Sequence, residues 1–203
     1  NDGIVRIAIN SSEPKISNRV INLCNILISH SSVPIEFHFF LIQKNIAFEK
    51  SLYERINSNL KTHPPADYNT YMKNLSICDL AIGTFPFGGS NTNLDLALLG
   101  IPKVTYTEAT DLASYTDQSI QTRLDLPKIL KATSETELVS SLIYLIHDKT
   151  MRDKISEAIN SQNPYKLFYA PEVPKDDNQL INAIKWINET DYKKKHTDGK
   201  SHQ

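Results

Sequence analysis

A polar, glycine-containing stretch near the middle of the chain separates two apolar segments. It reads TFPFGGSNTNLDLALLGIP and runs from Thr84 to Pro102. Gly88 and Gly89 lack a β-carbon, so the backbone there can adopt positive φ and approach a ligand closely. If a helix begins just after the glycines, its first amides favour an anion such as a diphosphate. The side chains that can add hydrogen-bond donors at this helix start are Ser90, Asn91 and Thr92.

Asp95 lies one helical turn after Asn91, so in a helix the two side chains share one face. A carboxylate there would repel phosphate, but it can accept hydrogen bonds from both hydroxyls of a ribose. A structural explanation stays open, in which Ser90 or Asn91 caps the helix and Asp95 interacts favourably with the helix dipole. Short glycine motifs do not decide between these two interpretations.

Two further loops carry residues suited to binding a phosphate or a base. Lys15 and Ser12 follow the first apolar segment, and an ammonium there can neutralise a pyrophosphate that faces the glycine stretch. His63 precedes Pro64 and Pro65, which stiffen its loop into a wall against which a base or phosphate can lie. A solvated lysine, a serine helix cap and a surface histidine are the alternative interpretations of these residues.

The composition excludes several other kinds of site. The 203 residues carry 22 basic and 23 acidic side chains, a balance that gives no strong field for nucleic acid or an anionic membrane. Cys24 and Cys78 lie in apolar segments without metal-ligand spacing, so we expect reduced buried thiols in a cytoplasmic protein. No apolar run is long enough to span a bilayer. Because no Asp-x-Asp pair occurs, we expect neither a metal ion nor a cofactor. No Gly-x-Ser-x-Gly motif occurs either, and the sequence identifies no catalytic residue.

Apolar runs of strand type and of helix type alternate along the chain. The predicted strands are 4–9, 35–41, 79–85, 103–107 and a short extended piece at 129–132. The predicted helices are 20–28, 48–60, 68–75, 94–101, 112–124, 135–147 and 151–160. This alternation predicts an α/β fold, a Rossmann-like parallel sheet with helices on both faces. Ligands of such sheets bind beyond the carboxyl ends of the strands, where the loops after residues 9, 41 and 85 would share one rim.

The end of the chain has a different character. Residues 163–174, NPYKLFYAPEVP, predict a proline-bearing connector that crosses a surface, and 178–188 predict a last helix with one apolar face. That helix is a candidate to cross onto a partner domain. We expect a single domain over residues 1–190 and a polar, disordered tail over residues 191–203.

Four stretches of the sequence resemble one known family in their order and spacing. They are VRIAINSSEPK, IEFHFFL, THPPADYNTYMKNLSICDLAIGTFPFGGSNTNLD and QTRLDLPKILKAT. The family is that of the bacterial cytoplasmic N-glycosyltransferases that modify adhesins, which are related to the O-GlcNAc transferases and have the GT-B fold. The resemblance covers residues 5–132 and is most specific from Phe85 to Asp95. It implies the C-terminal, UDP-binding half of a GT-B glycosyltransferase.

The resemblance implies that this domain binds the nucleotide of a UDP-sugar, typically UDP-glucose. By position, Lys15 matches a lysine that meets the diphosphate, and Asp95 matches the acid that binds the ribose. Asn91 and its neighbours match residues that bind the phosphates at a helix start, and His63 matches a histidine beside the nucleotide. The implied nucleotide-binding set is Ser12, Lys15, His63, Gly88, Gly89, Ser90, Asn91, Thr92 and Asp95.

The chain departs from the family's pattern at two places. The family has His-Glu-His where this chain has Ala113-Ser114-Tyr115, and it usually has asparagine at the position of Gly89. The residues that follow the first departure do match the family, namely Asp117, Arg123, Leu124, Leu126 and Pro127. Because that loop faces the inter-domain cleft in the family, the change bears on sugar choice and on activity.

Three functions remain open at this point. The first is the donor-binding domain of an inverting, metal-independent hexosyltransferase, with glucose as the expected sugar. Such an enzyme also needs an N-terminal half, in the same or another chain, to position the acceptor protein. The second is a non-catalytic module of the same ancestry that serves as an interaction subunit. The third, an epimerase-like fold, is disfavoured because the first loop, NSSEPKIS, contains no glycine to admit a pyrophosphate.

Overall fold

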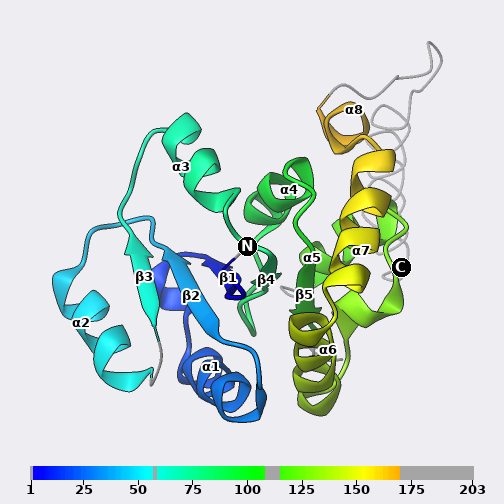
Figure 1. Ribbon diagram of the computed structural model, residues 1–203. Coiled ribbons are helices and arrows are strands. Elements are labelled where there is room, and N and C mark those ends of the chain that lie inside the picture. Colours follow the sequence, from blue (N-terminus) through cyan, green and yellow to red (C-terminus); the bar gives the residue numbers. More distant parts are fainter. Residues whose placement is uncertain (1, 57–58, 108–114, 170–203) are drawn as a thin grey trace, which may run out of the picture.

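Six parallel strands form one sheet through the centre of the computed structural model (Figure 1). The structure describes residues 2–56, 59–107 and 115–169. β1 and β2 are almost completely buried and mostly apolar, as expected of parallel strands that are covered on both faces. The sheet has the order β3-β2-β1-β4-β5-β6, with the strands β1 Val5–Asn10, β2 Ile35–Phe40, β3 Leu60–His63, β4 Leu80–Ile82, β5 Lys103–Tyr106 and β6 Lys131–Ala132.

Helices connect the strands, and several begin at side-chain caps. The Ser17 hydroxyl accepts a hydrogen bond from the Val20 amide at the start of α1, and the Asp67 carboxylate accepts one from the Thr70 amide at the start of α3. None of the described helices is long and apolar enough to cross a membrane. The helices are α1 Asn18–His30, α2 Ile46–Arg55, α3 Tyr68–Leu75, α4 Ser90–Leu98, α5 Tyr115–Arg123, α6 Glu135–His147, α7 Lys149–Ser161 and α8 Pro164–Phe168, with short 3-10 turns η1 Glu13–Lys15 and η3 Lys128–Leu130.

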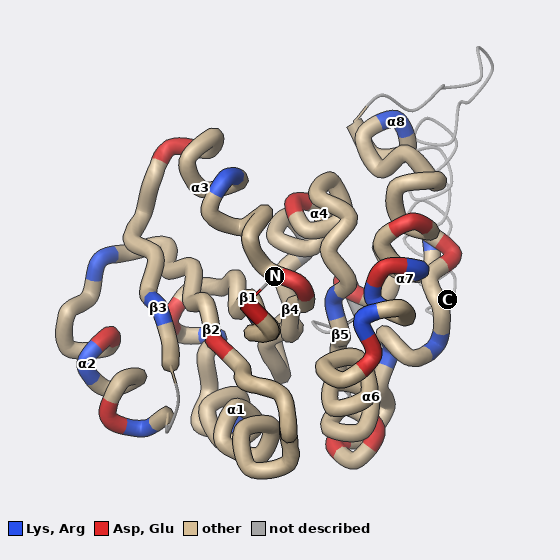
Figure 2. The backbone as a smooth tube through the Cα atoms, in the orientation of Figure 1, with Lys and Arg blue, Asp and Glu red and all other residues tan. Residues whose placement is uncertain are grey.

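Helices cover both faces of the sheet. α1 and α6 lie side by side against one face, where alternate strand residues such as Ile7 and Ile9 join the larger core (Figure 1). Ala8 and Ala81 point to the opposite face and form a smaller core with Leu75 of α3 and Leu96 of α4. Basic and acidic residues are interspersed along α2 and α7 (Figure 2).

The strand order reverses beside β1, which creates a crevice at the carboxyl ends of the strands. The chain runs from β1 outward to β3, then returns to place β4 on the other side of β1. The loops after β1 and β4 therefore separate at this point, the usual ligand position in doubly wound sheets. The register also places Asn10, Phe40 and His63 side by side at the ends of β1, β2 and β3.

The predicted α/β Rossmann-like sheet is confirmed, although several elements differ locally from the prediction. β3 was not predicted, because LKTH has a single apolar residue and lacks a β-branched run, and its leucine was instead assigned to the preceding helix. The predicted connector at 163–174 begins as helix α8, with Pro164 at its first position. Gly89 has φ −141°, and the positive φ expected of the glycine pair is found instead at Gly3 and Gly100. The predicted helix at 178–188, the domain boundary at 190 and the tail lie outside the described residues.

We expect Leu75→Ala to lower the free energy of unfolding by about 2–5 kcal/mol, because it removes a fully buried side chain between α3 and the sheet. Urea unfolding followed by circular dichroism measures the change. The control Lys73→Ala alters an exposed residue of the same helix and should change stability by less than about 0.5 kcal/mol. Equal losses in the two variants would contradict the assigned packing.

Candidate functional site

The glycine pair lies at the start of α4, where a side chain at either glycine would collide with a neighbour. A β-carbon added to Gly88 would lie 2.7 Å from Asp117 Oδ2, and one added to Gly89 would lie 2.5 Å from Thr92 Oγ1. The lack of room for a β-carbon explains these two glycines better than a need for an unusual backbone conformation. Gly89 is the N-cap residue and has no side chain to accept from the next amides. The amides of residues 90–92 are therefore left as donors at the positive end of the helix dipole.

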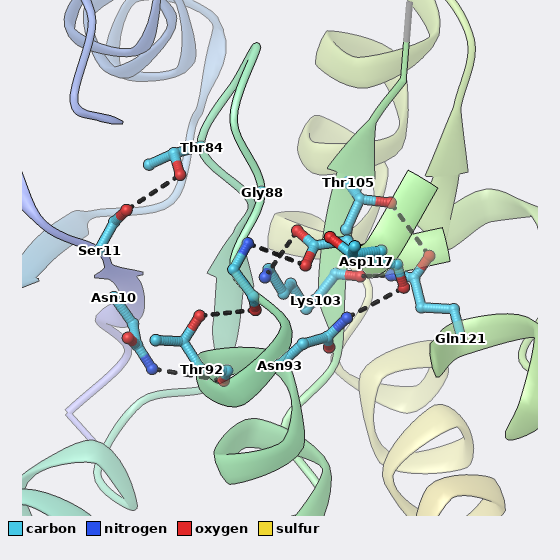
Figure 3. A network of polar contacts seen from close by, with 12 residues as sticks. Asn10, Ser11, Thr84, Gly88, Thr92, Asn93, Lys103, Thr105, Asp117 and Gln121 are labelled. Carbon is cyan, nitrogen blue, oxygen red and sulfur yellow. Dashed lines mark hydrogen bonds and ion pairs between the residues drawn. The ribbon is translucent and has the colours of Figure 1, made fainter. Parts of the chain in front are cut away.

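A buried carboxylate holds this helix start in place (Figure 3). Asp117 Oδ1 accepts a hydrogen bond of 3.1 Å from the Gly89 amide, and Oδ2 lies 2.9 Å from the Lys103 ammonium. Both side chains of the ion pair are almost fully buried. Asn93 completes the arrangement by donating to the Asp117 carbonyl at 3.1 Å. The network joins β5, α5 and α4, so the position of the glycines is fixed by residues distant in sequence.

Lys15 contacts the same turn from the opposite side. Its ammonium donates a hydrogen bond of 2.7 Å to the carbonyl of Gly88. An ammonium has three N–H donors, so this bond leaves donors for an anion at the turn. The predicted approach of Lys15 to the glycine stretch is therefore present in the structure. Its role in binding phosphate stays a prediction.

A pocket of about 260 Å³ opens at the carboxyl ends of β1, β2 and β3. The row formed by Asn10, Phe40 and His63 contributes to its lining. The His63 ring lies flat on the Phe40 ring, with centroids 4.3 Å apart and an interplanar angle of 5°. The remaining lining residues are Leu41, Ile42, Pro64, Pro65, Ala66, Tyr71, Asn74, Thr92 and Asp95.

Asp95 is oriented by two phenols from the neighbouring helix α3. Tyr68 donates to Asp95 Oδ1 at 2.9 Å, and Tyr71 donates to Oδ2 at 3.0 Å. Burial, together with the bond to Asp95, raises the pKa of Tyr68 to about 12 and also raises the pKa of Tyr71. Both phenols therefore remain protonated donors at neutral pH. Each carboxylate oxygen still has a lone pair, so Asp95 can accept two more hydrogen bonds, the number that a ribose diol offers.

His63 is tied to the sheet by a second histidine. His63 Nε2 lies 2.9 Å from His38 Nδ1, and His38 Nε2 lies 2.8 Å from Glu36 Oε1. Burial lowers the pKa of His63 to about 4, with a further contribution from His38 and Lys61, and burial also lowers the pKa of His38. Both ring nitrogens of His38 therefore have hydrogen-bond partners within the sheet. His63 is a neutral aromatic wall of the pocket at physiological pH.

The structure brings most of the predicted site residues together. His63, Thr92 and Asp95 line the pocket, while Lys15 contacts Gly88 at the adjacent turn. The Thr92 hydroxyl also donates a hydrogen bond to the Gly89 carbonyl at 2.9 Å, so Thr92 has a structural role at the start of α4 as well.

Three other predicted residues lie at the edge of this group. Asn91 is exposed and lines a second hollow of about 720 Å³, together with Tyr68, Tyr165 and Tyr169. Ser12 is partly buried at the N-cap position of η1, without a capping bond from its side chain. Ser90 is the first residue of α4. Ala113 and Ser114 lie outside the described residues, and Tyr115 begins α5.

Several residues of the site were not predicted as functional. Tyr68 and Tyr71 stand three apart in α3, a spacing that places both on one face, and this was the available signal. Asp117 was noted only as a match to the family, and its bond to Gly89 depends on contacts between α4 and α5. The contact of His38 with His63 depends on the pairing of β2 with β3.

Comparison with known proteins extends these observations. No family profile matches the chain. Two proteins of Actinobacillus pleuropneumoniae, from serotypes 5b and 7, are 27% identical to it over 167 residues. Both are named UDP-glucose:protein N-beta-glucosyltransferase, and the match covers 80% of this chain. The resemblance to protein N-glycosyltransferases is confirmed. The chain spans 27% of the length of these curated relatives.

Solved structures show the same fold in other glycosyltransferases. A mutant O-GlcNAc transferase of Thermobaculum terrenum superimposes with a TM-score of 0.71 at 18% identity, over 83% of this chain and 33% of that chain. The catalytic domain of a cholesterol-alpha-glucosyltransferase from Helicobacter pylori gives 0.58 at 15% identity, over 79% of this chain and 98% of that one. The chain therefore shares the Rossmann-like fold of GT-B glycosyltransferases.

We expect the stability of the protein to fall as the pH decreases from about 6.5 to about 4. Because the pKa of His63 is lower in the folded state, the unfolded chain binds more protons in this interval, and stability rises with pH there. Urea unfolding of wild type and His63→Gln across the interval measures the effect. The variant should show a weaker pH dependence, with His38 accounting for the remainder. Parallel curves would mean that His63 is not held neutral by folding.

Proposed function

We propose that this chain binds the nucleotide of a UDP-sugar and acts as the donor-binding domain of a protein glycosyltransferase. The observation that carries this proposal is the oriented carboxylate of Asp95, which lies in the pocket at the crevice of the sheet, near the start of α4. A carboxylate with two free lone pairs fits a ribose diol, and the amides of a helix start fit a diphosphate. The activity for which the Actinobacillus relatives are named supports UDP-glucose as the donor.

In this proposal each group meets one part of the nucleotide. Lys15 and the amides of residues 90–92 bind the diphosphate, Asp95 binds the ribose hydroxyls, and His63 lies beside the base. Because an ammonium and a helix dipole supply the positive charge, the diphosphate does not require a divalent ion. Metal-independent binding is therefore part of the proposal.

The reaction that we propose is transfer of a hexose, with glucose as the expected sugar, to a protein side chain with inversion at the anomeric carbon. UDP-glucose carries an α-linked sugar, and the name of the relatives specifies a β-linked product, so a single displacement fits. The acceptor must then approach the anomeric carbon from the face opposite the diphosphate. We propose that a second domain, in the same or another chain, positions it.

A non-catalytic module is the second candidate function. The observation that favours it is the sequence Ala113-Ser114-Tyr115, where the resembled family has two histidines and a glutamate. Such a module would keep the fold and interact with a partner, and it would bind nucleotide weakly or not at all.

We expect UDP to bind with equal affinity in EDTA and in Mg²⁺, measured by isothermal titration calorimetry on the full chain. Lys15→Ala and Asp95→Asn should each weaken UDP binding by about tenfold to a hundredfold, because each removes a charge-assisted hydrogen bond. The affinity for uridine should be lowered by Asp95→Asn and left unchanged by Lys15→Ala, because uridine has no diphosphate.

The matched control is Lys50→Ala, which removes a charge from an exposed lysine that pairs with Glu54 on α2. It should leave the affinity for UDP unchanged. No binding of UDP to the wild-type protein at millimolar concentration would overturn the nucleotide site and favour the non-catalytic module.

A further inference from the structure

A chain of three hydrogen-bonding groups runs from the sheet into the pocket. Glu36 Oε1 lies 2.8 Å from His38 Nε2, and His38 Nδ1 lies 2.9 Å from His63 Nε2. The His38 side chain is completely buried, and Glu36 is nearly so. The Glu36 carboxylate also accepts from Lys61 at 3.1 Å. These hydrogen bonds lower the pKa of Glu36 against the opposing effect of burial, so Glu36 is ionised.

The ionised carboxylate determines where each imidazole proton lies. A carboxylate only accepts, so His38 Nε2 must carry a hydrogen. A neutral imidazole carries one hydrogen, which leaves His38 Nδ1 as an acceptor and requires a hydrogen on His63 Nε2. His63 Nδ1 then holds a lone pair. The low pKa values of both histidines agree with this neutral state.

The acceptor on His63 has no protein donor within the described part of the chain. The two residues that follow His63 are Pro64 and Pro65, and neither has an amide hydrogen to donate back to the ring. The hydrogen bond found for the ring is made through Nε2. The stack on Phe40 and the bond to His38 hold the ring in one orientation, because a flipped ring would lose the bond to His38. The ring itself lines the pocket.

We propose that Glu36 and His38 are positioning residues that fix His63 Nδ1 as a hydrogen-bond acceptor, so that the pocket selects a base with a ring N–H donor. Uracil and thymine carry a hydrogen on N3, whereas N3 of cytosine has a lone pair and would face another acceptor. The inference rests on the proposed nucleotide site and adds the origin of its base selectivity. A missing hydrogen bond between buried polar groups discriminates strongly, because both groups are left unpaired.

The test compares the dissociation constants of UDP and CDP by calorimetry on the full chain. Wild type should bind UDP more tightly than CDP by about tenfold or more. In Glu36→Gln the side-chain amide can donate to His38, which permits the reversed chain of hydrogen bonds, and the CDP to UDP ratio should fall towards one. His38→Phe should lower the same ratio by releasing His63. Glu49→Gln is the matched control, because Glu49 accepts from Thr62 beside His63 but has no hydrogen bond to the three groups, and its ratio should equal that of wild type.

A ligand-free measurement separates this inference from the proposed function. Long-range ¹H–¹⁵N NMR of the imidazoles should show an unprotonated Nδ1 and a protonated Nε2 on His63 in wild type. A hydrogen on Nδ1 would overturn the inference even if UDP binds. Equal affinities of wild type for UDP and CDP would overturn it as well, while leaving the nucleotide site intact. Absence of binding by both nucleotides would overturn the proposed function and this inference together.

Discussion

The contact between the buried Asp117 carboxylate and the Gly89 amide is the constraint on which the arrangement of the site depends. A single carboxylate joins the start of α4 to α5 and, through Lys103, to the sheet. A buried ion pair is weak evidence for stability, since its desolvation offsets its attraction, but loss of one partner leaves an uncompensated charge. Here the carboxylate also occupies the space that a side chain at Gly88 would need. The position of the glycine turn, the need for glycine at position 88 and the burial of the Asp117 carboxylate are therefore linked.

The other half of the site is built by strand register. Parallel pairing aligns Asn10, Phe40 and His63 at one end of the sheet, and the reversal of strand order leaves a crevice beside them. α3 then supplies the tyrosines that meet Asp95 of α4 across this crevice. Three segments distant in sequence converge on one pocket because the carboxyl ends of parallel strands share an edge. This geometry is common to many chemistries, so the chemical identity rests on the side chains.

The sequence was sufficient to predict the sheet and most of the helices, because their apolar periodicity is strong. α3 at 68–75 and α6 at 135–147 have the predicted limits. β3 was missed because a four-residue edge strand buries too little to leave a pattern. The convergence of Lys15 with Gly88 was predicted from the shared rim of the loops. The roles of Asp117 and His38 could not be predicted, since they depend on helix packing and strand register that no local pattern encodes.

The two phenols on Asp95 also affect the entropic cost of binding a ligand. A free aspartate side chain samples several rotamers. Ordering a side chain on binding costs free energy, about 0.5–1.5 kcal/mol for one with many rotamers and less for a short one such as aspartate. Tyr68 and Tyr71 have already ordered this carboxylate during folding. The conformational entropy of that side chain is lost before any ligand is present, so binding in this half of the pocket does not have to order it. Folding and molecular recognition thus share one entropic cost at Asp95.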